Sequence, residues 1–320
     1  MAQRDDEWGA ALVDPGGYLG RIGVLGALPP TPETLRRLHR AHQLALPFGN
    51  LDPALGRPVP LEPELVQAKL VGRGREGYCF EHNLLFAAVL ERLGFRVTRL
   101  AARALLNADR PLPRTHLVLV VAAGPARFLA DVGFGVKGPL EPLPLADGAL
   151  LRDGARSHLL RRTGSAPDRW DLELRDTAGR LPLYRFEGGP ALHQPDCVVM
   201  NHYTATHPRS PFTGRIHLTR FAPGRRLTLD GRTLTVERAD GRIETARLGD
   251  RQCADALAGD FGIRLGPDDL RAVLRLLPAA DRTPDAGGGP PPPAPPPPPP
   301  RGRPPRRPPP APPPRRGKRG

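Results

Sequence analysis

Cysteine is scarce in this sequence. Among its 320 residues only Cys79, Cys197 and Cys253 are cysteines. An odd number of cysteines with no C-x-x-C spacing argues against a disulfide framework and against a structural zinc site. Such sparse usage is typical of a protein in a reducing compartment. We therefore predict a cytoplasmic protein without disulfides.

Several other signatures are also absent. No apolar run approaches the length of a membrane span, and residues 1–8 are acidic and polar, unlike a signal peptide. There is no Walker-type P-loop and no Rossmann glycine fingerprint. His202, His207 and His217 lack the spacing of zinc ligands. The sequence thus predicts no membrane association, no nucleotide site of these two types and no bound metal.

Acidic residues disappear from the C-terminal end. Residues 287–320 contain 18 prolines, seven arginines, one lysine and no acid, so eight of the 14 net positive charges lie there. A segment of this composition cannot bury a core, and we predict a disordered Pro/Arg-rich tail over 280–320. The high isoelectric point is then mainly a property of the tail, and we predict no nucleic-acid partner. The proline-rich sequence also raises the possibility of an SH3-like partner.

The remaining chain predicts an α+β fold in three parts. Residues 1–94 are mostly helical: Thr31 followed by Pro32 is typical of a helix start, and apolar residues follow it at helical spacing. Residues 95–200 contain short alternating strands, which predict an antiparallel β-barrel. Residues 201–279 contain a strand meander with Asp-Gly turns and two short helices, which predict a C-terminal α/β lid.

The most informative stretch surrounds Cys79. A glycine-containing turn, Gly74 to Gly77, leads into Cys79 and then into an apolar helical period that ends near Gly94. A thiol at a helix N-terminus faces the positive end of the helix dipole, which favours the thiolate. A lone cysteine is also often a small buried core residue, so the neighbours of Cys79 decide between the two interpretations.

Two short apolar strands downstream carry His116 and Asp131. Residues 122–125 between them are a turn signal. A hairpin with this four-residue loop places His116 directly opposite Asp131, with Cβ atoms roughly 4.5–5.5 Å apart. A histidine alone in an apolar strand is more often a core residue. Together with a cysteine at a helix start, the pair predicts a cysteine-protease-like Cys-His-Asp core.

The sequence around these residues resembles a known family. Residues 77–83 (Gly-Tyr-Cys-Phe-Glu-His-Asn), Thr115-His116 and residues 131–135 (Asp-Val-Gly-Phe-Gly) are similar to the signature of the arylamine N-acetyltransferases, in particular the actinobacterial ones. The resemblance extends over about residues 10 to 278. In that family a cysteine is acetylated by acetyl-CoA and passes the acetyl group to an arylamine or arylhydrazine.

The resemblance implies roles for eight residues. It makes Cys79 the nucleophile, His116 its base and Asp131 the carboxylate that orients the histidine. Ping-pong kinetics through an acetyl-cysteine follow from that mechanism. The remaining five residues are expected to contact substrates: Phe48, Phe134 and Phe212 for the aromatic acceptor, and Gly133 and Gly135 for acetyl-CoA.

Three positions depart from the family pattern. Glu76 stands where the family usually has the first of two glycines before Tyr-Cys, and Gly49 stands where it usually has a glutamate. We interpret these two changes as an exchange, in which Glu76 replaces the missing partner of Arg75. Val136 replaces a second glycine after Gly135 and is expected to narrow the loop near the thioester.

Three other functions remain open at this point. A relative of this family closes macrolactam rings in ansamycin biosynthesis with a carrier-protein thioester and the same triad. A thiol hydrolase or a transglutaminase-like enzyme also uses Cys, His and Asp in this chain order. The third possibility is a non-enzymatic scaffold acting through the proline-rich tail.

Overall fold

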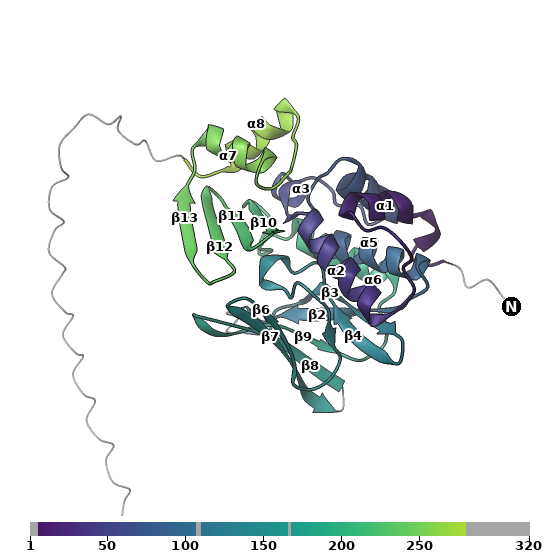
Figure 1. Cartoon of the computed structure of the whole chain (residues 1–320). Coiled ribbons are helices and arrows are strands. Elements are labelled where there is room, and N and C mark those ends of the chain that lie inside the picture. Colours follow the sequence, from purple (N-terminus) through teal and green to yellow (C-terminus); the bar gives the residue numbers. More distant parts are fainter. Residues whose placement is uncertain (1–5, 107–109, 166–167, 280–320) are drawn as a thin grey trace, which may run out of the picture. The chain divides into compact units, whose positions relative to one another are not determined.

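The computed structural model describes residues 6–106, 110–165 and 168–279 (Figure 1). The predicted tail over 280–320, with its possible SH3-like partner, lies outside these ranges. Within them the structure is a mixed α+β fold, as the sequence predicts. No helix in the described part of the chain is long and apolar enough to cross a membrane.

Helices dominate the N-terminal part. Thr31 accepts a hydrogen bond from the Thr34 N–H (3.2 Å) and Pro32 occupies the first helical position, so the predicted helix start is confirmed. The apolar faces of these helices meet in one core, in which Tyr18, Leu35 and Phe86 are fully buried. The helices are α1 (Pro15–Ile22), α2 (Pro32–Ala45), α3 (Leu51–Ala54), α4 (Pro63–Gln67) and α5 (Cys79–Arg92), with helical turns at Ala10–Leu12 and Ala68–Gly72.

An antiparallel sheet of eight strands follows, in the order β5-β4-β3-β2-β9-β8-β7-β6. Its two end strands, β5 and β6, contact each other, so the sheet is a nearly closed barrel. Leucines and aromatic residues such as Trp170 and Phe186 fill the interior. The strands are β2 (Arg96–Ala104), β3 (Arg114–Ala123), β4 (Ala126–Ala130), β5 (Leu143–Pro144), β6 (Ala149–Asp153), β7 (Arg156–Ser165), β8 (Asp168–Asp176) and β9 (Gly179–Glu187).

A second antiparallel sheet has the order β1-β10-β11-β12-β13. Its first strand comes from the helical part of the chain, so this sheet ties residues 48–49 to the C-terminal region. Two helices cover it, at the top of Figure 1, and the predicted meander is confirmed. Its elements are β1 (Phe48–Gly49), β10 (His217–Ala222), β11 (Arg225–Asp230), β12 (Thr233–Arg238), β13 (Ile243–Arg247), α7 (Asp250–Ala258) and α8 (Pro267–Leu276).

One helix contradicts the strand interpretation of residues 95–200. Helix α6 (Gln194–Thr206) begins within that range. Its buried residues, Cys197, Asn201, Thr204 and Ala205, have helical spacing, but two of the four are polar. An apolar periodicity therefore cannot reveal this helix. The division of residues 1–279 into three domains, and the description of the third as a lid, stay predictions.

The predicted register of the β3–β4 hairpin is wrong by two residues. Leu119 pairs with Ala130 and Ala123 with Ala126, so the loop has two residues, Gly124 and Pro125, instead of four. Gly124 has φ 58°, the conformation that a type II′ turn requires at its first loop position. The ladder ends three residues before His116, and Asp131 lies beyond the end of β4.

Candidate active site

Cys79 is the first residue of α5, as predicted, and it is buried. The turn before it is held from two sides. The Tyr78 N–H donates to Glu81 Oε2 (3.0 Å), which fixes the helix start, and the Gly49 N–H donates to the Gly77 carbonyl (2.7 Å). A Cβ at Gly77 would lie 2.9 Å from Glu81 Oε2 and 2.9 Å from Leu70 Cδ2, so a side chain there would displace both groups. The thiol is thus carried by a rigid turn.

His116 and Asp131 come together although the predicted strand register is wrong. His116 is near the start of β3 and Asp131 directly follows β4. The His116 Nε2 and Asp131 Oδ2 atoms are 2.7 Å apart, and both residues are buried. Because Nε2 faces the carboxylate, Nδ1 is the ring nitrogen left for Cys79. The Cys79 thiol itself donates a hydrogen bond to the Thr115 carbonyl, with 3.8 Å between sulfur and oxygen.

The charges at this pair favour an imidazolium beside a carboxylate. Burial by itself lowers the pKa of His116, but the charge and hydrogen bond of Asp131, with a smaller contribution from Cys79, raise it to about 10. Burial acts to raise the pKa of Asp131, and it is outweighed by His116, Asn83 and the Gly133 N–H, which hold the pKa below its usual range. At neutral pH the pair is therefore ionised.

Asn83 is a site residue that the sequence argument missed. Its Nδ2 donates to Asp131 Oδ1 (2.9 Å) and to the Leu117 carbonyl (2.7 Å), while its Oδ1 accepts from the Val132 N–H (3.0 Å). Asn83 lies one helical turn after Cys79, on the same face of α5. The spacing of four residues between Cys79 and Asn83 is the sequence feature that could have indicated this role. One amide thereby fastens the cysteine helix to the segment that carries Asp131.

Gly133 and Gly135 are both buried, for different reasons. A Cβ at Gly133 would lie 2.7 Å from the Cys79 Cα, so this glycine packs directly on the backbone of the cysteine. Gly135 has φ 67°, a left-handed conformation that favours glycine. Packing at Gly133 and the backbone angle at Gly135 account for both glycines, and their role toward acetyl-CoA stays a prediction.

Aromatic rings surround the cysteine and the histidine. The Phe134 ring stands edge-on to the His116 ring, with 5.0 Å between centroids. Phe212 lies 5.5 Å from the Tyr78 ring and 6.1 Å from the Phe48 ring, and all three belong to the apolar cluster around Cys79. Phe48 and Phe212 thus lie in the cluster of Cys79, whereas Phe134 packs against His116 and the barrel interior. The sequence argument missed a further ring, Tyr184, whose centroid is 5.1 Å from that of His116.

Comparison with known proteins shows the family of this chain. The sequence model of a family described as N-acetyltransferase matches residues 31–270. The chain is 41% identical over 261 residues to the arylamine N-acetyltransferase of Mycolicibacterium smegmatis, covering 79% of this chain and 93% of the relative. The chain belongs to the arylamine N-acetyltransferase family. The resemblance stated from the sequence is confirmed.

Solved structures of arylamine N-acetyltransferases share the fold. The enzyme from Mycobacterium abscessus superposes with a TM-score of 0.80 at 34% identity, covering 86% of this chain and 99% of that one. The Mycobacterium marinum enzyme, whose structure was solved in complex with CoA, superposes with a TM-score of 0.76 at 35% identity, covering 82% and 100%. The match spans almost the full length of both neighbours.

In this member of the family the two departures before Cys79 lie against each other. A Cβ at Gly49 would lie 2.8 Å from the Glu76 Cγ, so Glu76 fills the space beside the glycine. Glu76 is fully buried, and its Oε2 is 3.2 Å from the Arg75 Nε. The third departure, Val136, packs with Leu140 and Phe221 in a small apolar cluster.

A buried ion-pair cluster lies beneath the same turn. Lys69 Nζ contacts Asp52 Oδ2 (2.6 Å) and Glu81 Oε1 (2.7 Å). Glu81 is the residue that also accepts the Tyr78 N–H. The cluster therefore holds the carboxylate that fixes the start of the cysteine helix.

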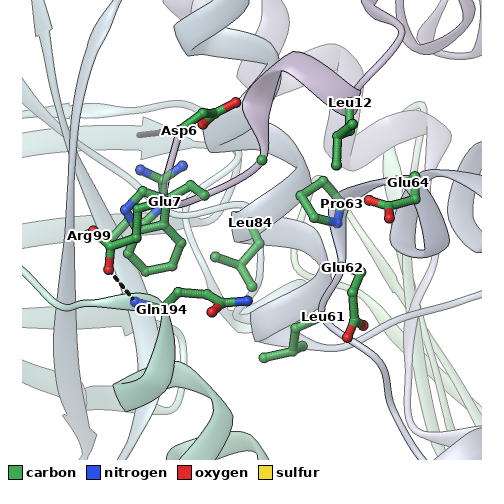
Figure 2. A pocket seen from close by; sticks show the side chains of 12 residues that line it. Asp6, Glu7, Leu12, Leu61, Glu62, Pro63, Glu64, Leu84, Arg99 and Gln194 are labelled. Atoms are coloured by element: carbon green, nitrogen blue, oxygen red, sulfur yellow. Dashed lines mark hydrogen bonds between the residues drawn. The ribbon is translucent and has the colours of Figure 1, made fainter. Parts of the chain in front are cut away.

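A surface cavity of about 200 Å³ lies elsewhere (Figure 2). At its edge Glu7 accepts a hydrogen bond from the Gln194 N–H (2.9 Å), and the Arg99 guanidinium stacks on Trp8. None of the eight predicted site residues lines it. Its volume is below that of most ligand pockets, roughly 300–1,000 Å³, so we assign it no ligand. Among the described residues no group of three or more His, Cys, Asp or Glu is arranged to hold a metal ion.

Proposed function

We propose that this protein transfers an acetyl group from acetyl-CoA to an arylamine or arylhydrazine through an acetylated Cys79. The hydrogen bond between His116 Nε2 and Asp131 Oδ2 carries this proposal. It leaves Nδ1 for the thiol proton and makes His116 basic enough to hold that proton at neutral pH. Full-length similarity to arylamine N-acetyltransferases supports the donor and the acceptor class.

The first half-reaction loads the cysteine. With the thiol proton already held on His116 Nδ1, the Cys79 thiolate attacks the carbonyl carbon of the thioester. The tetrahedral oxyanion is held by the free backbone N–H groups at the start of α5. The bond between the acetyl carbon and the CoA sulfur then breaks, and His116 returns the proton to the leaving thiolate.

The second half-reaction regenerates the enzyme. The nitrogen of an arylamine attacks the acetyl carbon of acetyl-Cys79, His116 accepts the nitrogen's proton, and the bond from carbon to the Cys79 sulfur breaks. Aromatic amines suit this step because they are weakly basic and remain unprotonated near neutral pH. Phe48, Phe134 and Phe212 supply aromatic walls for a flat ring. The resulting kinetics are ping-pong.

Mass spectrometry of the purified protein tests both halves. Incubation with acetyl-CoA alone should add one acetyl group to the peptide that contains Cys79, and an arylamine should remove it as the acetylated amine. Cys197 and Cys253 are internal controls: both are free and buried, and burial raises the pKa of Cys197 to about 12. The variant Cys79→Ala should remain unlabelled.

Other outcomes point to other functions. Continuous CoA release without an amine and without a lasting adduct would indicate a thiol hydrolase. If acetyl-CoA does not load the folded protein but a carrier-protein thioester does, the protein is an enzyme of the kind that closes macrolactam rings.

The three free cysteines support a reducing, cytoplasmic location for the protein.

A further inference from the structure

A single imidazole joins the two ends of the loop that follows β4. His39, in α2, is fully buried. Its Nε2 accepts a hydrogen bond from the Asp131 N–H (3.2 Å), and its Nδ1 lies 3.0 Å from the Leu140 carbonyl oxygen. Asp131 is the first residue of this loop, which runs from residue 131 to residue 142, and Leu140 lies near its other end. The loop also carries Phe134, whose ring contacts His116.

These partners determine the protonation state of His39. The Leu140 carbonyl can only accept, so Nδ1 must carry a proton. The Asp131 N–H can only donate, so Nε2 must have none. Only the neutral Nδ1–H tautomer meets both conditions. Burial favours it, lowering the pKa of His39 to about 4 against the raising effects of the Leu140 carbonyl and Asp131.

The next turn of α2 contributes a second bond to the same loop. Gln43, four residues after His39, donates its side-chain N–H to the Pro139 carbonyl. The edge of the Phe86 ring, from α5, packs against the His39 ring at 5.9 Å between centroids. Helix α2 therefore fixes the loop at both ends, whereas Asn83 of α5 fixes the Asp131 side chain.

We propose that His39 is a positioning residue that sets the Asp131 backbone, and through it the orientation and basicity of His116. The inference rests on the proposed function, because Asp131 matters only if His116 acts on Cys79. Loss of the hydrogen bonds of His39 to Asp131 and Leu140 leaves the buried Asp131 N–H and the buried Leu140 carbonyl without the imidazole as a partner, which the loop relieves by moving. Small displacements of a catalytic group are costly in rate.

The test compares two replacements of His39. His39→Leu removes donor and acceptor, whereas His39→Gln retains one of each on a side chain of similar reach. The readout is the rate of iodoacetamide alkylation of Cys79 from about pH 5 to about pH 10, which reports the thiolate–imidazolium pair without any acetyl donor. We expect His39→Leu to lower the rate near neutral pH by roughly 10- to 100-fold and to move its rise to higher pH. His39→Gln should stay within about threefold of the wild type.

His42→Leu is the matched control. His42 is an equally buried histidine of α2, but its ring bonds Tyr18 and His82 instead of the Asp131 loop. It should lose stability while keeping the wild-type alkylation profile. A wild-type profile for folded His39→Leu would overturn the proposal, as would equal losses in His39→Gln or in His42→Leu.

Two further variants complete the design. If His39→Leu does not fold, His39→Asn replaces it, because its shorter amide cannot reach both loop ends. Equal profiles for His39→Asn and His39→Gln would then overturn the proposal. Asp131→Asn separates the proposed function from the role of His39. If the alkylation profile changes in Asp131→Asn but not in His39→Leu, only the role of His39 is rejected. An unchanged profile in Asp131→Asn rejects the proposed function and the role of His39 with it.

Discussion

At the scale of single residues, Glu76 and Gly49 form a reciprocal pair. Glu76 places a buried carboxylate beside Gly49 of β1, which has no side chain. Burial raises the pKa of Glu76, and the charges of Lys69 and Arg75 oppose that rise. Arg75 has further partners in Asp52 and Asp269, so the carboxylate is one part of a network.

The exchange hypothesis predicts compensation between positions 49 and 76. Glu76→Gly should lower the free energy of unfolding by about 1–3 kcal/mol, because Arg75 loses a buried partner. Gly49→Glu should also destabilise, because its side chain meets Glu76 and Leu218. The double variant should recover at least about 1 kcal/mol relative to the sum of the single effects. Urea unfolding of the four proteins measures this coupling energy.

A variant without charge controls for packing. Glu76→Gln keeps the shape of the side chain but cannot pair as an ion with Arg75, so its loss should lie between zero and that of Glu76→Gly. Additive effects in the double variant would contradict the exchange. So would a Glu76→Gly protein with unchanged stability and an unchanged rate of Cys79 acetylation.

At the scale of elements, the hairpin β3–β4 has a loop whose glycine is conformationally required. Gly124 has φ 58° and is exposed, and a Cβ there would meet no atom closer than 4.0 Å. Gly124→Ala should therefore destabilise by backbone strain alone, by about 1–2 kcal/mol. Gly20→Ala is the matched control, because Gly20 is exposed inside α1 with open space around it, and it should stabilise by roughly 0.5–1 kcal/mol. Thermal unfolding distinguishes the signs, and equal shifts would contradict the turn assignment.

This hairpin also shows what the sequence could and could not predict. The two strands follow from residue types and order. His116 and Asp131 do meet, but the register from which their meeting was predicted is wrong. The register does not, because the choice between a two- and a four-residue loop depends on backbone angles at Gly124 that the letters do not determine. Helix α6 could not be predicted from apolar periodicity because half of its buried residues are polar.

The sequence could not predict the roles of Asn83 and His39, which support the site, for a related reason. Asn83 and His39 act through hydrogen bonds between elements that are far apart in sequence, 48 and 92 residues from Asp131. Periodicity and propensity describe only local preferences, so they cannot find such pairs. Local patterns indicated Cys79, His116 and Asp131, family resemblance supplied their roles and the other five predicted residues, and the long-range hydrogen bonds required coordinates.

At the scale of the whole molecule, buried histidines set the pH dependence of stability. Burial is the first cause that lowers the pKa of His39, His82 and His158, each to about 4. In the unfolded chain these groups titrate near 6.5. Between these values the unfolded form binds more protons, so stability falls as pH falls from about 6.5 to about 4. Each group contributes on the order of 3 kcal/mol to that loss.

His116 has the opposite sign. Its pKa is raised to about 10, so its contribution is fully present below about 6.5 and is lost as pH rises through 10. Together with the three lowered histidines, it predicts greatest histidine-linked stability near pH 6.5. His158 provides a test at a residue other than the predicted site residues. It lies in β7, and its Nε2 bonds the Lys137 carbonyl, in the loop that follows β4.

The measured quantity is the difference in free energy of unfolding between wild type and variant. The titration of the carboxylates that both proteins share cancels in this difference. His158→Gln retains a donor for the Lys137 carbonyl but cannot titrate, so its free energy of unfolding should fall less steeply than that of the wild type between about pH 6.5 and about pH 4. His116→Gln should instead remove the decline between about pH 6.5 and about pH 10. Urea unfolding at constant ionic strength measures both curves. Parallel curves for wild type and His158→Gln would mean that His158 binds its proton equally well in the folded and unfolded chains. The lowered pKa of His158 would then be wrong.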